Sequence, residues 1–344
     1  MMILSFEQLQ AITCGTSYME RDEDGLRFYR LNREQMAYYR ENNTAFYNKA
    51  KTTSGIRLYF KTDSRKLRLD LTLEKVMGRS YGAVEVFVNG EKIGAMENFS
   101  DKDLTGNFAE KAYPSKREDV TFDLGDGEKT VSVWFPRLIG VVLHSVELDD
   151  GAAVVPVKPP RKVLVFGDSI TQGFDCLWAT SHYLYPLCRE LDGEEFNRAI
   201  GGERHVPYLV ECTEDFVPDY IVVAYGTNDW RCEKVEDFLV MCRGFYENLA
   251  KYYPGIPVIA ITPVWRVDME AVKDIIHFGP IHEIEQYIRQ ITAPYANVTV
   301  VRGYEFIPQD PYMFGDLRLH PNDEGFAHYG KNLVLALKSQ GFFK

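Results

Sequence analysis

The chain has 344 residues, of which 45% are hydrophobic and 13% aromatic, and its net charge is −11. This length and apolar content suffice for two domains with separate cores. An acidic chain lacks the basic face that nucleic acids and anionic membranes require, so we expect neither as a partner. The N-terminus has no basic and apolar leader, and no apolar run is long enough to span a membrane. These features predict a cytoplasmic protein.

The cysteines are scattered without CxxC or Cys/His metal spacing: Cys14, Cys176, Cys188, Cys212, Cys232 and Cys242. In a cytosolic enzyme such cysteines are expected to be small buried hydrophobic residues rather than disulfides. The sequence therefore predicts no metal site.

The first half of the chain alternates apolar and polar residues in short runs separated by turn signals. The runs lie at 55–60, 67–73, 84–88, 120–124 and 130–135. Asn89-Gly90 directly follows the third run and favours a tight hairpin. Period-two alternation of this kind predicts a β-sandwich, of jelly-roll type, over residues 1–155.

A Pro-rich connector at 153–160 separates this region from a second domain, predicted at 156–344. There the pattern changes, and apolar runs begin near Lys162, Phe196, Tyr220, Pro257 and Val298. Amphipathic segments alternate with them, the longest at 235–253, 269–291 and 323–339. Repeated β-then-α units predict an α/β fold, a parallel sheet with helices on both faces.

Four polar segments follow the predicted strands or open the last helix. They are Gly167-Asp168-Ser169, Asn197 to Gly202, Tyr225 to Asp229, and His320 to Gly325. In open α/β sheets, ligands bind at the carboxyl ends of the strands, so we expect these segments to meet there. A serine hydroxyl becomes a nucleophile when a base removes its proton, and His320 can do this near neutral pH.

Hydrolysis of an ester also needs donors for the oxyanion that forms on the carbonyl oxygen. A glycine allows a backbone N–H to approach closely, and an asparagine amide donates without titrating. Ser169, Gly202 and Asn228 can supply two backbone N–H groups and one side-chain amide.

These four segments, in this order, resemble those of the SGNH, or GDSL-type, hydrolase superfamily. The resemblance covers the second domain and implies a flavodoxin-like three-layer α/β/α fold and ester hydrolysis without metal or cofactor. It implies that Ser169 is the nucleophile, that His320 is the base, and that Ser169, Gly202 and Asn228 form the oxyanion hole. The N-terminal region looks, more loosely, like the β-domain of certain acetyl-sugar esterases.

The sequence departs from this family at one position. The family usually has an aspartate three residues before the histidine, where this chain has Leu317, and Asp316 lies one residue further away. Either a one-residue bulge brings Asp316 to the imidazole, which we expect, or a Ser-His dyad is oriented by a backbone carbonyl. Asp323, three residues after His320, is expected to cap the last helix.

Trp230 and the pair Trp265-Arg266 follow predicted strands, so they are candidates for substrate binding. Aromatic rings stack on sugars and limit acyl length. We therefore predict a serine esterase that removes acetyl groups from carbohydrates, with a small-molecule or oligosaccharide ester as its partner. A lipid acylhydrolase or thioesterase and an inert carbohydrate-binding protein stay open as alternatives, as does assembly into a homo-oligomer.

Overall fold

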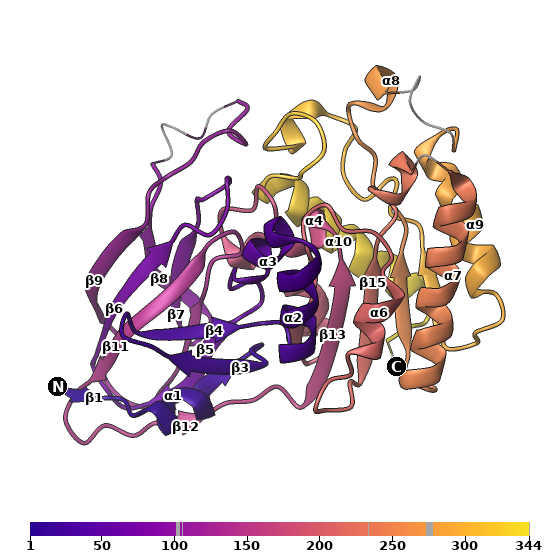
Figure 1. The fold of residues 1–344 in the computed structure, drawn as a ribbon. Helices are drawn as coiled ribbons and strands as arrows, with labels where there is room; N and C mark the ends of the chain where they lie inside the picture. The colour runs from indigo at the N-terminus through magenta and orange to yellow at the C-terminus, as the bar shows by residue number, and fades with distance from the viewer. Residues whose placement is uncertain (101–103, 105, 233, 273–277, 344) are drawn as a thin grey trace.

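The structure is a computed structural model, and it describes residues 1–344 except 101–103, 105, 233, 273–277 and 344. Two antiparallel sheets make up the N-terminal half and one parallel sheet the C-terminal half, side by side in Figure 1. The part of the chain that is described contains no helix with both the length and the apolarity needed to cross a membrane.

The N-terminal half contains two antiparallel sheets, in the orders β3-β4-β11-β6-β9 and β12-β5-β10-β7-β8, with β1 and β2 added to β11 and β5. The strands are β1 Met2–Ile3, β2 Thr13–Cys14, β3 Tyr18–Arg21, β4 Leu26–Tyr29, β5 Arg57–Thr62, β6 Lys66–Glu74, β7 Ala83–Val88, β8 Glu91–Glu97, β9 Lys116–Asp123, β10 Lys129–Trp134, β11 Gly140–Leu148 and β12 Val155–Pro156. Both sheets direct alternate side chains into one shared core, as period-two sequences require. The more specific jelly-roll description stays a prediction.

The predicted hairpin lies between β7 and β8, where Asn89 and Gly90 both have positive φ, 51° and 87°. This is the backbone conformation that an Asn-Gly hairpin turn requires. The predicted domain boundary at residues 155 and 156 falls within β12, which pairs with β5.

Three helices in this half were not expected from the sequence: α1 Phe6–Ile12, α2 Arg33–Asn42 and α3 Thr44–Ala50. Capping boxes begin α1 at Ser5 and α2 at Asn32, because each cap side chain accepts a backbone N–H while a glutamine reaches back to it. Met36 and Tyr39 of α2 belong to the same buried cluster as Phe166 of the parallel sheet. The two halves therefore share part of one core.

The C-terminal half is a three-layer α/β/α unit. Its sheet has the order β14-β13-β15-β16-β17, which is the 2-1-3-4-5 order of flavodoxin-like folds. The elements are β13 Arg161–Gly167, α4 Ser169–Gln172, α5 Leu184–Glu190, β14 Gly193–Asn197, α6 Pro207–Glu211, β15 Tyr220–Ala224, α7 Val235–Tyr252, β16 Val258–Ile261, α8 Met269–Val272, α9 Ile284–Thr292, β17 Val298–Val301 and α10 Asp323–Ser339. Short 3₁₀ helices lie at Ala179–Ser181, Asp229–Arg231, Ile281–Glu283 and Pro311–Met313.

Alternate residues of each strand face opposite layers. Leu164 and Phe166 of β13 pack with α6, α7 and α9, whereas Val163 and Val165 pack with α5 and α10. All six cysteines are buried and free, as predicted.

Two predicted elements differ from the structure. The long helix predicted at 269–291 is divided, because α8 ends at Val272 and α9 begins at Ile284; residues 273–277 lie outside the described part of the chain. Strand β14 begins at Gly193, before the apolar run at Phe196. Its Glu194 and Glu195 are buried because the N-terminal half provides a partner for each. Glu194 accepts the N–H of Gly15 at 2.7 Å, and Glu195 pairs with the guanidinium of Arg137 at 2.9 Å.

Candidate active site

Ser169 lies where β13 ends and α4 begins. Asp168 is the N-cap of α4, and its side chain accepts the N–H of Ile170 at 2.9 Å. Asp168 therefore has a structural role in this turn. Gly167 is needed here, because a Cβ would lie only 2.5 Å from the Thr171 side chain. The strand and the tight turn thus place the Ser169 hydroxyl at the carboxyl edge of the sheet, 4% exposed.

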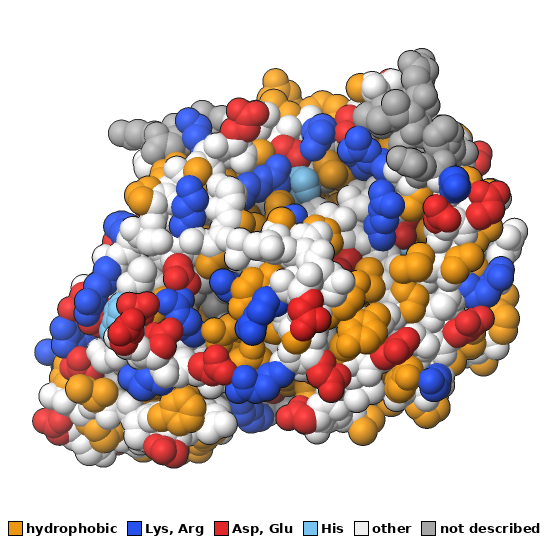
Figure 2. All heavy atoms as spheres, in the orientation of Figure 1, with side chains coloured by type: hydrophobic (Ala, Val, Ile, Leu, Met, Phe, Trp, Pro, Cys, Tyr) orange, Lys and Arg blue, Asp and Glu red, His pale blue; other side chains and the backbone are white. Residues whose placement is uncertain are grey.

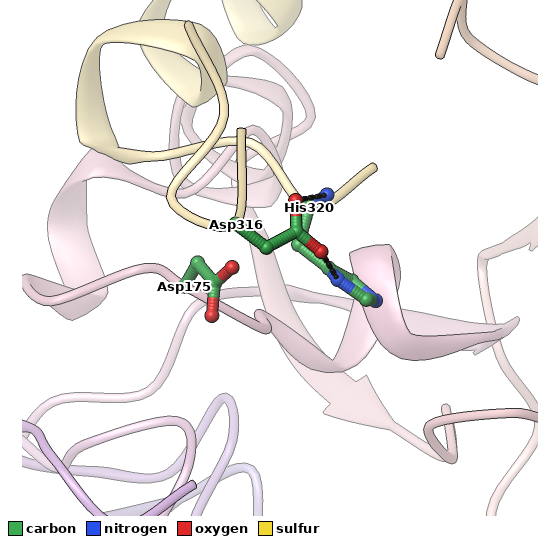
Figure 3. A group of neighbouring side chains, drawn as sticks. All are labelled: Asp175, Asp316 and His320. Carbon is green, nitrogen blue, oxygen red and sulfur yellow. Dashed lines mark hydrogen bonds and ion pairs between the residues drawn. The ribbon is translucent and has the colours of Figure 1, made fainter. Parts of the chain in front are cut away.

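His320 lies in the loop before α10, and its two ring nitrogens have different partners. Nε2 is 2.8 Å from Oγ of Ser169, and Nδ1 is 2.6 Å from Oδ2 of Asp316. Figure 3 shows the Asp316 carboxylate turned toward the ring. A proton on Nδ1 that is donated to Asp316 leaves Nε2 free to accept the serine proton. The pKa of His320 is lowered to about 4. Burial and the positive charge of Arg79 both lower it, and together they outweigh the effect of Asp316, which raises it.

A turn accommodates the additional residue between Asp316 and His320. Leu317 has φ +53°, a left-handed conformation that costs a non-glycine residue about 1–3 kcal/mol. In return, Oδ1 of Asp316 accepts the backbone N–H groups of residues 318, 319 and 320 at 2.7–3.0 Å. These bonds and the contact with His320 hold the pKa of Asp316 well below its usual value. The structure therefore places the carboxylate, and no backbone carbonyl, on Nδ1.

Asp323 does not cap α10, contrary to the prediction. The N-cap is Asn322, whose side chain accepts the N–H of Gly325 at 3.0 Å. The Asp323 carboxylate instead accepts the N–H of Trp178 at 3.1 Å, so it fastens the 177–178 loop to α10. The reason is that Asn322, one residue earlier, already occupies the cap position and its side-chain oxygen accepts the helix N–H.

The predicted oxyanion donors lie in two loops after β14 and β15. Gly202 has φ +92°, and a Cβ there would lie 3.4 Å from the Phe46 ring of α3. Asn228 donates one amide hydrogen to the carbonyl oxygen of Glu203 at 2.9 Å, which leaves its second amide hydrogen for a ligand. Among the hydrogen bonds between described residues, none is donated by the backbone N–H of Ser169 or Gly202.

Glu203 supports this oxyanion region through its hydrogen bonds, a role that the sequence does not predict. Its carboxylate accepts the hydroxyl of Tyr225 at 3.1 Å and the hydroxyl of Tyr39, from α2 of the N-terminal half. Burial raises the pKa of Glu203 to about 8. Asp229, next to Asn228, pairs with Nδ1 of buried His205 at 3.0 Å.

The predicted substrate-binding residues are mostly not at an open surface. Trp230 is 2% exposed and its indole N–H donates to the carbonyl of Gly279 at 2.8 Å. Arg266 is 1% exposed and paired with Asp268, with one guanidinium N–O distance of 2.8 Å. Their polar groups are already satisfied inside the protein, so the geometry does not support substrate contact for either. Trp265 is half-buried, with its ring 5.7 Å from that of Phe314.

Sequence reasoning also missed Arg79, in the loop between β6 and β7. Its guanidinium is 3.0 Å from Nδ1 of His320, 3.4 Å from Asp316 and 3.1 Å from Asp175. No motif marks Arg79, and only the packing of the two halves brings it here. Asp175, Asp316 and His320, drawn in Figure 3, offer ligand atoms within 4.8 Å of one another. A metal ion could use such spacing, but here the guanidinium of Arg79 pairs with the two carboxylates and lies beside the imidazole.

Comparison with known proteins agrees with this geometry. The GDSL-like lipase/acylhydrolase family matches residues 165–328, which include Ser169, Gly202, Asn228, Asp316 and His320. No curated protein matches the chain by sequence.

Solved structures match across both halves, at low sequence identity. A putative GDSL-like lipase from Bacteroides ovatus has a TM-score of 0.76 at 15% identity, covering 100% of this chain and 98% of that chain. The salicylyl-acyltransferase SsfX3 of a tetracycline biosynthetic pathway has a TM-score of 0.76 at 18% identity, covering 96% and 94%. A family two carbohydrate esterase from Cellvibrio japonicus has 0.63 at 16% identity, covering 96% of each chain. These likenesses show the fold. The family match identifies residues 165–328 as a GDSL-like lipase/acylhydrolase domain, that is, a carboxylic ester hydrolase domain.

Proposed function

We propose that this protein removes short acyl groups, chiefly acetyl, from carbohydrate esters through an acyl-serine intermediate. The observation that carries the proposal is the continuous chain from Ser169 Oγ to His320 Nε2 at 2.8 Å and from Nδ1 to Asp316 at 2.6 Å. A nucleophile, a base and an orienting acid linked in this way are the arrangement that activates a serine.

In the proposed reaction, His320 Nε2 takes the hydroxyl proton as Ser169 Oγ bonds to the ester carbonyl carbon. The N–H groups of Ser169 and Gly202 and the free amide hydrogen of Asn228 donate to the oxyanion. The C–O bond to the sugar then breaks, and His320 returns its proton to the leaving alcohol. Water attacks the acyl-serine with His320 again as base, which releases the acid and restores the serine. Asp316 stabilises the imidazolium at both stages.

The carbohydrate preference is supported by the architecture, in which a β-rich half precedes the catalytic half as in the family two carbohydrate esterases. This is support from fold analogy, and the same chemistry serves a lipid acylhydrolase or a thioesterase. An inert carbohydrate-binding protein is the third alternative, and the intact hydrogen-bonded serine disfavours it.

Acyl transfer to an alcohol is a second candidate. The likeness to an acyltransferase over 96% of the chain favours it. It differs from hydrolysis only in the second nucleophile, since an alcohol replaces water in the attack on the acyl-serine.

Two measurements test these proposals. p-Nitrophenyl acetate, butyrate and octanoate give the acyl-length preference, and a panel of acetylated sugars, assayed by released acetate, gives the alcohol side. We expect acetate to exceed butyrate and octanoate to be almost inert, with activity retained after dialysis against EDTA. A preference for octanoate would favour the lipid alternative, and acyl transfer exceeding hydrolysis when a sugar alcohol is added would favour the transferase.

A further inference from the structure

Arg79 reaches the catalytic group from the other half of the molecule. It lies between β6 and β7 of the N-terminal half, and its side chain is 16% exposed. Its guanidinium lies 5.1 Å from the centre of the Phe174 ring, which in turn lies 5.2 Å from the imidazole of His320. In Figure 2, Lys and Arg side chains surround a histidine in a hollow on the upper part of the face shown.

The charges around Arg79 explain what it does there. Asp175 and Asp316 are both buried, and the guanidinium bridges them, with NH1 on Asp175 and NH2 on Asp316. Tyr81, two residues after Arg79, donates its hydroxyl to Asp175. Two ionised carboxylates in one buried site repel each other unless a cation lies between them. Burial raises the pKa of Asp175 to about 7, and Arg79 opposes that rise.

Arg79 also acts on the imidazole directly. The Nδ1 hydrogen goes to Asp316, so the nearby NH1 group is a positive charge beside the ring rather than a second partner for it. That charge disfavours the imidazolium and so keeps Nε2 able to accept a proton. The other titratable or charged groups near His320 in the described chain are Ser169 from α4, Asp175 from the loop after α4 and, in its own loop, Asp316 and Arg318.

We propose that Arg79 is a positioning residue, which holds Asp316 against Nδ1 and keeps His320 unprotonated, so that the catalytic group is completed by the N-terminal half. The part that concerns turnover rests on the proposed function, whereas the effect on His320 does not.

Kinetics of Arg79→Gln and Arg79→Lys test the first part. Loss of a charge-assisted contact of this kind should lower kcat by about 10- to 100-fold with little change in KM. The acid limb of the kcat/KM profile should move to higher pH, because Asp316 then acts on His320 unopposed. Arg79→Lys should return the limb toward the wild-type position and restore part of kcat, since an ammonium supplies the charge but cannot bridge both carboxylates. Arg68→Gln, on the preceding strand β6, is the control for loss of one positive charge.

Two outcomes of these kinetic measurements would contradict the proposed role of Arg79. A lower melting temperature with an unmoved acid limb would make Arg79 merely a fastener between the halves, and a rise in KM alone would make it a substrate ligand. Either overturns the proposal.

NMR titration of the His320 ring in the Ser169→Ala protein tests the second part without any substrate, with His320→Gln used for assignment. The proposal requires the pKa of His320 to rise in Ser169→Ala/Arg79→Gln relative to Ser169→Ala. An unchanged pKa would refute it. If the pKa rises but Ser169→Ala still hydrolyses esters, the proposed function fails and the inference stands.

Discussion

The two halves contribute to the site in different ways. The α/β half supplies Ser169, His320 and Asp316, the groups that would change protonation or bond to substrate. The β-rich half supplies Arg79 and Tyr39: Arg79 pairs with Asp316 and Asp175 beside the catalytic group, and Tyr39 with Glu203 of the oxyanion region. The reacting atoms thus belong to one half, and two of the residues that set their charge and position belong to the other.

The two kinds of group differ in what fixes their position. A reacting group must lie at a strand end of the parallel sheet, so its place is fixed locally by a turn, as with Ser169. A supporting group needs only a side chain long enough to reach, and it can come from any neighbouring surface. Variants in the α/β half should therefore abolish chemistry, and variants in the β-rich half should attenuate it.

The largest expected effect is that of Ser169→Ala. Without the nucleophile, turnover should fall by about 10⁶-fold, the size of loss known for serine hydrolases of the triad type. Folding should be unaffected, since the variant removes one oxygen at the end of β13. Esterase assays and thermal melts measure both effects. Retention of a tenth of wild-type activity by the folded variant would exclude Ser169 as nucleophile.

Asp316→Asn should follow, because an amide cannot stabilise the imidazolium and favours the wrong ring tautomer. Loss of the acid in a full triad costs about 10⁴-fold in turnover. Asp323→Asn is the matched control, since Asp323 bonds the N–H groups of residues 177 and 178, Sγ of Cys176 and the Ser181 side chain rather than His320, and it should keep near-wild-type rates. Similar rates in wild type and both variants would mean that a Ser-His dyad suffices.

Asn228→Ala should lower turnover by about 10²–10³-fold, since it removes a donor that acts on the transition state. KM should change less than kcat. Asn332→Ala is the control, because Asn332 of α10 likewise donates to a backbone carbonyl at 2.9 Å, that of Phe306. An increase in KM alone would assign Asn228 to ground-state binding.

Local patterns were enough to predict most of the fold. Asp323–Ser339 and Val235–Tyr252 match their predicted helices almost to the residue, because each has a clear apolar stripe. The sequence does not predict helices α2 and α3, because their buried face packs against the other half. The predicted β14 is too short, because glutamates such as Glu194 and Glu195 are typical of exposed positions. In both cases the deciding partner lies far away along the chain.

The same distinction applies to the site. The residues at strand ends could be placed from the sequence, and Asp316 could be proposed, but the left-handed turn at Leu317 has no sequence signal because leucine rarely adopts it. For Arg266, the sequence does not decide between a polar group of the substrate and a neighbouring carboxylate. A charged residue after a strand looks available until its partner, Asp268, is seen.

The smallest effect is expected from Tyr39→Phe, which tests the contribution of the β-rich half to the oxyanion region. The variant removes only the hydroxyl that bonds the buried carboxylate of Glu203, whose own carbonyl oxygen holds Asn228. The free energy of unfolding should fall by about 1–2 kcal/mol, and kcat by less than in Asn228→Ala.

The loss of stability in Tyr39→Phe should depend on pH, and the pKa of Glu203 determines the direction. The pKa of folded Glu203 is raised, to about 8, so ionisation of this group costs stability as the pH rises from its unfolded value toward 8. The Tyr39 hydroxyl lowers that pKa, so its loss should destabilise the protein more at about pH 9, where the carboxylate is charged, than at about pH 6. Tyr38→Phe, one residue earlier on α2, is the matched control. Melting temperatures of the three proteins at both pH values decide the matter: an equal loss at both would mean that the hydroxyl serves packing alone, and that the β-rich half reaches the chemistry only through Arg79.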